Sequence, residues 1–209
     1  LSHLLEHLLY KGTKRRTARQ IREDVEGIGG YINAFTTEDH TCYYAKAGAG
    51  HFDRLCDVLS DIYRESRFSP TDVEREREVI REEIHMYRDQ PSDHVRELLS
   101  ETLWPEHPLG RPLTGTEESI GQFRRAHLAE FHEPNYCGAN TIVTVAGPIS
   151  HEEVVRTVEP LLRRLPKGRR PPFQRAPFST GPARINLHTD ETEQTHLAMG
   201  FHAFGRHDE

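Results

Sequence analysis

Apolar residues spaced three or four positions apart recur along the chain, and this spacing is typical of helices that bury one face. In the segment HFDRLCDVLSDIYRES, for example, Leu55, Leu59 and Ile62 fall on one such face. Serine is a good N-cap of a helix and proline suits the first turn, so Ser69 and Pro70 predict that a long helix begins here. The pattern predicts helices at about 1–11, 17–29, 51–66 and 70–89, from 92 onward, at 117–132 and from 150 onward, with Pro160 marking a kink or an early end of the last.

Strand-like alternation of apolar and polar residues occurs in the segments between these helices. YINAFTT (31–37) and HTCYYAKAG (40–48) are predicted to be two strands joined by a short polar turn. Three later segments have the same character, namely NTIVTVAG (140–147), ARINLHTD (183–190) and THLAMGFHAF (195–204). The sequence therefore predicts an α+β fold with two layers, in which helices cover a mostly antiparallel sheet.

The segment LPKGRRPPFQRAPFSTGP (165–182) has the proline and glycine content of a linker. It suggests a first unit over residues 1–165, a linker over 166–182 and the start of a second unit over 183–209. The chain begins at Leu1, inside a predicted helix, and ends just after a strand-like stretch. We therefore expect a piece of a longer protein that is cut at both ends and lacks the first strands of its first unit.

Composition narrows the classes of function. The 209 residues carry 27 basic and 33 acidic side chains mixed along the chain, and the formal net charge of -6 argues against a nucleic-acid partner. No apolar run approaches the roughly 20 residues that span a bilayer, so no membrane partner is expected. The three widely spaced cysteines do not suggest a disulfide framework and are expected to be small buried apolar residues. A cytoplasmic location is favoured, and the first residues carry no information on an export signal.

The segment SHLLEHLLYKGT (2–13) contains two histidines that flank a glutamate. On a helix, His3, Glu6 and His7 project from one face, and leucines cover the other. Zinc binds neutral imidazole nitrogens, and two histidines four residues apart can reach one ion, with the glutamate between them placed to accept a proton from water. A solvated amphipathic helix shows the same pattern, so a metal site needs a third ligand from elsewhere in the chain.

The segment VEREREVIREEIHMY (73–87) supplies candidates for that ligand. Glu76 and Glu83 fall on or beside the apolar stripe of this predicted helix, about two turns apart. Three other acids fall on the opposite side and are expected to be solvated: Glu74, Glu78 and Glu82. A carboxylate directed toward a core is costly unless it is paired or binds a metal. This pattern singles out Glu83 over its neighbour Glu82 and leaves Glu76 on the same stripe. The alternative, that both Glu76 and Glu83 pair with arginine or lysine at the rim, stays open.

Five segments together resemble the pitrilysin/insulinase family of zinc peptidases, in particular the branch of mitochondrial processing peptidase and its bacterial relatives. They are SHLLEHLLYKGT, GGYINAFTTEDHTCYYAK, EREREVIREEIHMYRDQP, HPLGRPLTGTEESI and FHEPNYCGANTIVTVAG. In this family the third ligand follows the inverted zinc motif, H-x-x-E-H, by about 76 residues. The same distance separates His7 from Glu83. The resemblance covers nearly the whole chain.

The resemblance implies a role for each candidate residue. It implies one zinc ion bound by His3, His7 and Glu83, with Glu6 as the general base that activates water. Glu76 would be a second acid that supports the site by orienting a ligand or the base. The NAFT segment matches the edge strand on which the family binds an extended peptide by strand addition, and it comprises Asn33, Ala34, Phe35 and Thr36. Without the resemblance, NAFT would be interpreted as an ordinary strand.

The function implied by the resemblance is that of a zinc-dependent endopeptidase acting on extended peptides or unfolded proteins. A second homologous half is also implied, fused or as a separate subunit of a dimer, and without it this chain is expected to be inactive. One alternative is a catalytically silent or substrate-capturing subunit of a paired peptidase assembly, although such subunits typically lose part of the motif. Another is a zinc lyase acting on a small thioether, which needs a cysteine at the site; nothing marks Cys42 or Cys56 for that role.

Overall fold

The computed structural model describes residues 1–177, 181–191, 193–203 and 205. Its elements are α1 (Ser2–Leu9), α2 (Ala18–Glu26), β1 (Tyr31–Thr36), β2 (Thr41–Lys46), η1 (Ala49–His51), α3 (Phe52–Glu65), α4 (Pro70–Arg88), α5 (Pro91–Leu103), η2 (Pro108–Gly110), α6 (Glu117–Gln122), α7 (Arg125–Asn135), η3 (Gly138–Asn140) and α8 (His151–Leu162). The fold is α+β, with helices packed around a small antiparallel sheet, as the sequence predicts.

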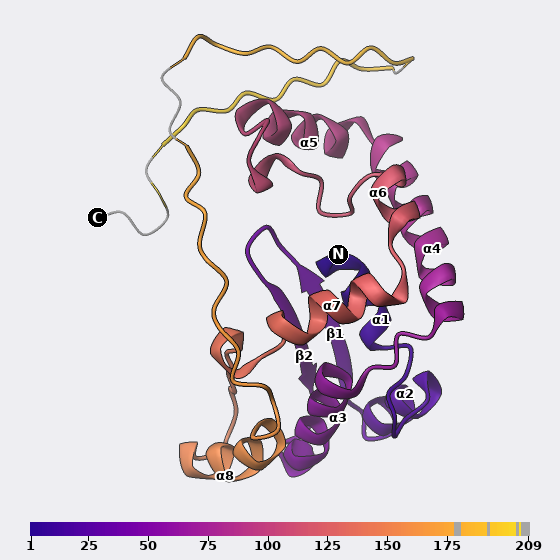
Figure 1. Ribbon diagram of the computed structural model, residues 1–209, viewed down its shortest axis with the longest axis vertical. Coiled ribbons are helices and arrows are strands. Elements are labelled where there is room, and N and C mark those ends of the chain that lie inside the picture. The colour runs from indigo at the N-terminus through magenta and orange to yellow at the C-terminus, as the bar shows by residue number, and fades with distance from the viewer. Residues whose placement is uncertain (178–180, 192, 204, 206–209) are drawn as a thin grey trace.

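Helix α1 lies at the centre of the packing, in contact with the β1–β2 hairpin on one side and with α4 on another (Figure 1). Its apolar face consists of Leu4, Leu5, Leu8 and Leu9, which are at most 1% exposed. Helices α2 and α3 pack against each other and against the hairpin. Because the leucines fix how α1 is rotated, the polar residues of the same helix must face away from this core.

The hairpin joins β1 and β2 in the register that pairs Asn33 with Tyr44 and Thr36 with Thr41. This confirms the predicted pair of strands and the polar turn between them. Among the described residues, the sheet has these two strands only, so the edge of β1 that faces away from β2 carries no strand partner.

One predicted helix is divided in two, and the early end considered for another at Pro160 is not seen. The helix expected at 117–132 is divided into α6 and α7, because Phe123 and Arg124 adopt extended backbone angles between them. Helix α8 continues two residues past Pro160, so this proline does not end it.

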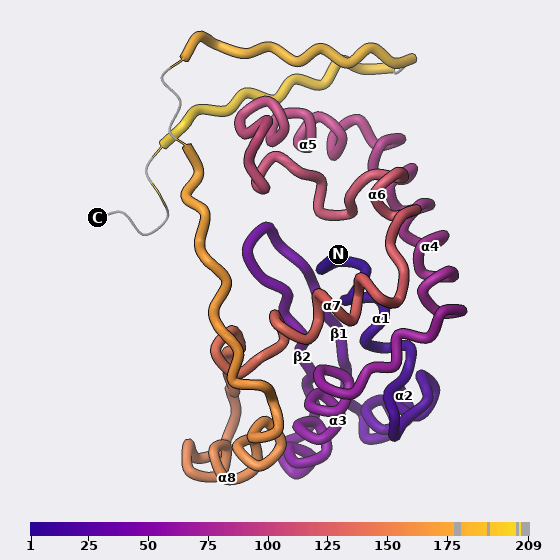
Figure 2. The backbone as a smooth tube through the Cα atoms, in the orientation of Figure 1, coloured from indigo at the N-terminus to yellow at the C-terminus, as the bar shows by residue number. Residues whose placement is uncertain are grey.

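The strands expected at 140–147, 183–190 and 195–203 are not formed within the described part of the chain, and residue 204 lies outside it. The apolar side chains of these segments are exposed, Ile142 and Ile185 by about nine-tenths. A strand needs a neighbouring strand to bond its backbone groups, and the β1–β2 sheet does not extend to these segments. After α8 the chain returns to the neighbourhood of α5 (Figure 2). There Arg184 donates a hydrogen bond to the carbonyl of Thr102, in the last turn of α5.

No helix of the described residues combines the length and apolar character needed to cross a membrane. The three cysteines are unpaired thiols, of which Cys137 is buried and Cys42 and Cys56 are half-buried. The expectation that the cysteines are small buried residues is therefore confirmed for Cys137 and wrong for Cys42 and Cys56.

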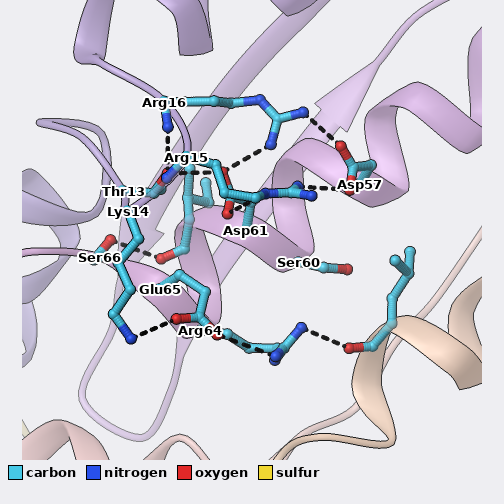
Figure 3. Close-up of polar contacts among 12 residues, drawn as sticks. Thr13, Lys14, Arg15, Arg16, Asp57, Ser60, Asp61, Arg64, Glu65 and Ser66 are labelled. Atoms are coloured by element: carbon cyan, nitrogen blue, oxygen red, sulfur yellow. Dashed lines mark hydrogen bonds and ion pairs between the residues drawn. The ribbon is translucent and has the colours of Figure 1, made fainter.

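The turn that follows α1 is fastened to α3 by Asp61, whose side chain is 1% exposed (Figure 3). Its carboxylate accepts hydrogen bonds from Thr13 Oγ1 at 2.8 Å, from Arg15 Nε at 3.0 Å and from Arg16 Nη1 at 2.8 Å. Asp57, one helical turn earlier, binds the same two arginines from a position that is 35% exposed. Charge-assisted bonds to a buried acceptor are strong, so this cluster fixes the path of the chain as it leaves α1.

Replacing Asp61 with asparagine is expected to lower the free energy of unfolding by about 1–3 kcal/mol, because the buried Thr13 and the largely buried Arg16 lose an ionised acceptor. Urea denaturation followed by circular dichroism measures the loss. Asp57→Asn is the matched control, since it removes a carboxylate bound to the same arginines at a more exposed position. Equal losses in the two variants would contradict a special role for the buried carboxylate.

Candidate metal centre

The polar face of α1 presents His3, Glu6 and His7 on the side opposite its four buried leucines. The helical repeat brings residues three and four apart onto one face, as the sequence predicts. All three side chains are half-buried; His3 and His7 approach acids of α4, and Glu6 is bonded to Thr36 of β1.

Helix α4 begins where the sequence predicts, with the Ser69 hydroxyl accepting the backbone N–H of Asp72 and Pro70 in the first turn. Its buried residues are Val73, Glu76, Ile80 and Ile84. Glu83 is half-buried, and the acids expected in solvent are exposed, namely Glu74, Glu78 and Glu82. The apolar stripe therefore turns Glu76 and Glu83, and not their neighbours, toward α1.

The structure brings together the side chains of His3, His7 and Glu83. Glu83 Oε2 lies 3.6 Å from His3 Nε2 and 3.7 Å from His7 Nε2, and the three ligand atoms all lie within 4.8 Å of one another. These separations are too long for hydrogen bonds. The two distances from Glu83 are close to the roughly 3.3 Å that separates two ligand atoms of a tetrahedral zinc ion with bonds of about 2.0–2.1 Å, and the ligand nitrogens of the two histidines lie within 4.8 Å of each other. The donor set therefore fits zinc with a fourth position open.

The protonation of His3 also suits a metal ligand. Burial, reinforced by the neighbouring His7, lowers the pKa of His3 to about 4, so its imidazole is neutral near pH 7. Metals bind the neutral ring. Burial is the largest influence on Glu83 and raises the pKa of its carboxyl, and the nearby Glu6 acts in the same direction. In the described residues Glu83 has no lysine or arginine within ion-pair distance, so its charge lacks a permanent cation.

Glu76 occupies a different position from Glu83. Its Oε2 lies 3.2 Å from His7 Nδ1, and its Oε1 lies 2.7 Å from Lys11 Nζ. Burial acts to raise the pKa of Glu76, but the hydrogen bonds from His7 and Lys11 outweigh it, and the pKa is lowered. The alternative that both acids pair with lysine or arginine therefore holds for Glu76, which binds Lys11, and does not hold for Glu83.

Glu6 is linked to the hairpin through Thr36 at the end of β1. The Thr36 hydroxyl donates a hydrogen bond to Glu6 Oε2 and lies 3.3 Å from the hydroxyl of Thr41. A carboxylate held by a hydroxyl has a defined orientation, so β1 positions Glu6 as well as lining the site.

A cavity of about 390 Å³ adjoins these residues, between α1, β1, α4, α5 and the loop at 109–114. Its wall includes His3, Glu6 and Glu83 together with Ala34, Phe35 and Thr36 of the NAFT segment. Asn33 is not part of this wall; its side chain bonds the Tyr31 hydroxyl and the Ala34 amide.

From the sequence, no role at the site is predicted for Lys11, for the 109–114 loop or for two residues of the cavity wall, Tyr87 and Glu97. Burial raises the pKa of Glu97, which lies on α5. Lys11 follows His7 by four residues, so the helical repeat that selected His3 and His7 could also have selected it. The loop has no comparable periodicity, and only tertiary packing brings it to the site.

The sequence H-x-x-E-H on α1 is the inverted motif of one class of zinc peptidases. The sequence model of the insulinase family (peptidase family M16) matches residues 1–117, and that of the peptidase M16 inactive domain matches residues 122–209. Because the first match covers more than half of the chain, the chain belongs to the insulinase family of peptidases.

Several bacterial proteins are similar to this chain over almost all of its length. The uncharacterized zinc protease ML0855 of Mycobacterium leprae is 38% identical over 208 residues, which are 98% of this chain and 47% of the relative. The uncharacterized zinc protease YmxG of Bacillus subtilis is 38% identical over 207 residues, covering 96% of this chain and 48% of the relative. The chain therefore spans about half the length of the curated relatives it matches.

Solved structures agree with the fold. A protease from Helicobacter pylori superposes with a TM-score of 0.78 at 25% identity, covering 84% of this chain and 44% of that one. Pitrilysin superposes with a TM-score of 0.72 at 24% identity, covering 83% of this chain and 19% of pitrilysin. At this level of identity the likeness to pitrilysin shows the fold alone.

Proposed function

We propose that this chain carries the zinc site of an endopeptidase that hydrolyses extended peptides or unfolded proteins. The observation that carries the proposal is the convergence of His3 Nε2, His7 Nε2 and Glu83 Oε2 at separations that suit one metal ion. The family membership and the names of the bacterial relatives support the choice of zinc and of peptide hydrolysis.

A zinc ion held there would act as a Lewis acid that polarises the scissile carbonyl and lowers the pKa of a water molecule. Glu6 is the proposed general base: its carboxylate takes a proton from the attacking water and returns it to the leaving amine. Thr36 orients this carboxylate through its hydroxyl. Glu76 holds His7 through Nδ1, which leaves Nε2 of the same ring for the metal.

The free edge of β1 is the proposed binding place for the substrate backbone. Among the described residues, β1 is bonded to β2 on one side and to no strand on the other. An extended peptide can add to such an edge by main-chain hydrogen bonds, which depend little on its sequence. Since Ala34, Phe35 and Thr36 also line the cavity, a peptide on this edge lies next to Glu6.

A second homologous half, fused or supplied by another subunit of a dimer, is part of the proposal. Support comes from the relatives, which are about twice as long as this chain, and from the match of residues 122–209 to a domain described as inactive. The alternative of a catalytically silent subunit has less support, because the motif and Glu83 are all present. The lyase alternative has no cysteine in its favour, because burial raises the pKa of Cys56 to about 11 and none of the described cysteines lines the cavity.

Removal of zinc tests the proposal. The full-length protein is expected to cleave an unstructured peptide, to lose this activity when a chelator removes the metal, and to regain it when zinc is added. A folded protein of similar length should resist cleavage under the same conditions. Activity that survives complete removal of zinc would overturn the proposed function.

A further inference from the structure

Lys11 lies beside the candidate centre, and the sequence predicts no role for it there. It follows the last turn of α1, and its ammonium lies 2.7 Å from Glu76 Oε1. The other oxygen of the same carboxylate lies 3.2 Å from His7 Nδ1. The three groups form a chain in the order Lys11, Glu76, His7, which ends at a proposed zinc ligand.

We propose that Lys11 is a positioning residue for the metal centre, holding Glu76 so that His7 presents Nε2 to the metal. Glu76 thereby becomes a partner of His7 rather than a ligand. The inference rests on the proposed zinc site and extends it to the residue that keeps the two glutamates in different roles.

Burial gives the first reason for this role. The Glu76 side chain is 7% exposed, and a carboxylate at such a place is costly unless a cation or several donors bind it. Within the described part of the chain, no lysine or arginine other than Lys11 lies within ion-pair distance of Glu76. Without it, one carboxylate oxygen would lack a partner, and the side chain would be free to turn from His7.

The contrast with Glu83 gives the second reason. Both acids lie on α4 and both approach His7, at 3.2 Å for Glu76 and 3.7 Å for Glu83. Lys11 binds Glu76 alone, so the charge of Glu76 is balanced by the protein before any metal arrives. The charge of Glu83 is left for the metal, and this asymmetry separates a ligand from a supporting acid on the same helix.

The chain on either side of Lys11 is fixed, which gives the third reason. The Lys11 amide donates to the carbonyl of Leu8, and the carbonyl of Gly12 accepts the amide of Arg67. Gly12 has a φ of +129°, a conformation that other residues rarely adopt. Thr13, the next residue, is bound to Asp61. A lysine on so constrained a backbone reaches Glu76 from a reproducible direction.

The tautomer of His7 in the metal-free protein tests the inference directly. Long-range proton–nitrogen NMR at mildly alkaline pH should show the proton of the wild-type His7 ring on Nδ1. Lys11→Met, which keeps a long side chain and removes the charge, is expected to shift the ring toward the Nε2–H tautomer. Lys11→Arg, which keeps a cation within reach, should restore the wild-type state.

Zinc affinity, measured by competition with a chelator, is the second readout. Lys11→Met is expected to weaken zinc binding by about 10–100-fold, the usual effect of removing a group that orients a ligand. Lys14→Met is the matched control, because Lys14 also forms a 2.8 Å ion pair, with Glu65, away from the cavity. It should leave both readouts unchanged, and thermal unfolding should confirm that each variant is folded.

The two readouts separate this inference from the proposed function. If wild-type protein binds zinc, and Lys11→Met keeps both its tautomer and its affinity, the role of Lys11 is refuted and the zinc site stands. If wild-type protein binds no zinc, the proposed function fails, and the tautomer comparison alone decides whether Lys11 orients His7.

Discussion

Replacing Glu6 with glutamine is expected to lower the rate of peptide cleavage by the full-length protein by about 10²–10⁴-fold, the usual contribution of a general base. Glutamine has nearly the shape of glutamate and still accepts the hydroxyl of Thr36, but it cannot take a proton from water. Glu6 is not one of the three clustered donors, so zinc content should stay at the wild-type level. Cleavage of an unstructured peptide and metal analysis of the same preparation give the two measurements.

Glu26→Gln provides the control for this experiment. Glu26 is an exposed glutamate at the end of the neighbouring helix α2, and its replacement should leave cleavage unchanged. If the Glu6 variant keeps the activity of the control, Glu6 is not the base. If it loses activity and zinc together, Glu6 contributes to metal binding and its proposed role must be revised.

Replacing Glu83 with glutamine is expected to weaken zinc binding by more than the roughly 10–100-fold that follows the loss of an orienting group, because a charged ligand is removed. The amide oxygen of glutamine is a neutral and weaker donor, while His3 and His7 remain in place. Chelator competition gives the affinity, and cleavage should fall with it at limiting zinc.

The neighbouring Glu82 gives a matched control within the same turn of α4. Glu82 is exposed and Glu83 is half-buried, so the two substitutions remove the same charge from adjacent positions that face different ways. Glu82→Gln should bind zinc as the wild type does. Equal losses in both variants would show that net charge on α4, and not ligation by Glu83, governs the affinity.

The sequence was most informative where a periodic pattern fixed the rotation of a helix. Four leucines determine which face of α1 is buried, and Val73, Ile80 and Ile84 do the same for α4. Once the buried face of each helix is known, only a few polar side chains of α4 can face the histidines of α1. For this reason the pattern could separate Glu76 and Glu83 from Glu82, and the structure agrees with the separation.

The parts that could not be predicted depend on contacts with remote segments. The apolar residues at 140–147 and 183–203 have strand-like alternation, but alternation does not show whether a neighbouring strand is present. The loop at 109–114 reaches the cavity only because α5 and η2 place it there. Lys11 was missed for a different reason, since its partner lies on another helix and the spacing of the motif ended at His7.

The central claim is that His3, His7 and Glu83 bind one zinc ion, and X-ray absorption at the zinc edge tests it most directly. The zinc-loaded protein should contain one ion per site with nitrogen and oxygen ligands at about 2.0–2.1 Å and the scattering pattern of two imidazoles. His7→Ala should remove one imidazole from that pattern or release the metal. A sulfur ligand at about 2.3 Å, or a zinc environment that His7→Ala leaves unchanged, would contradict the claim.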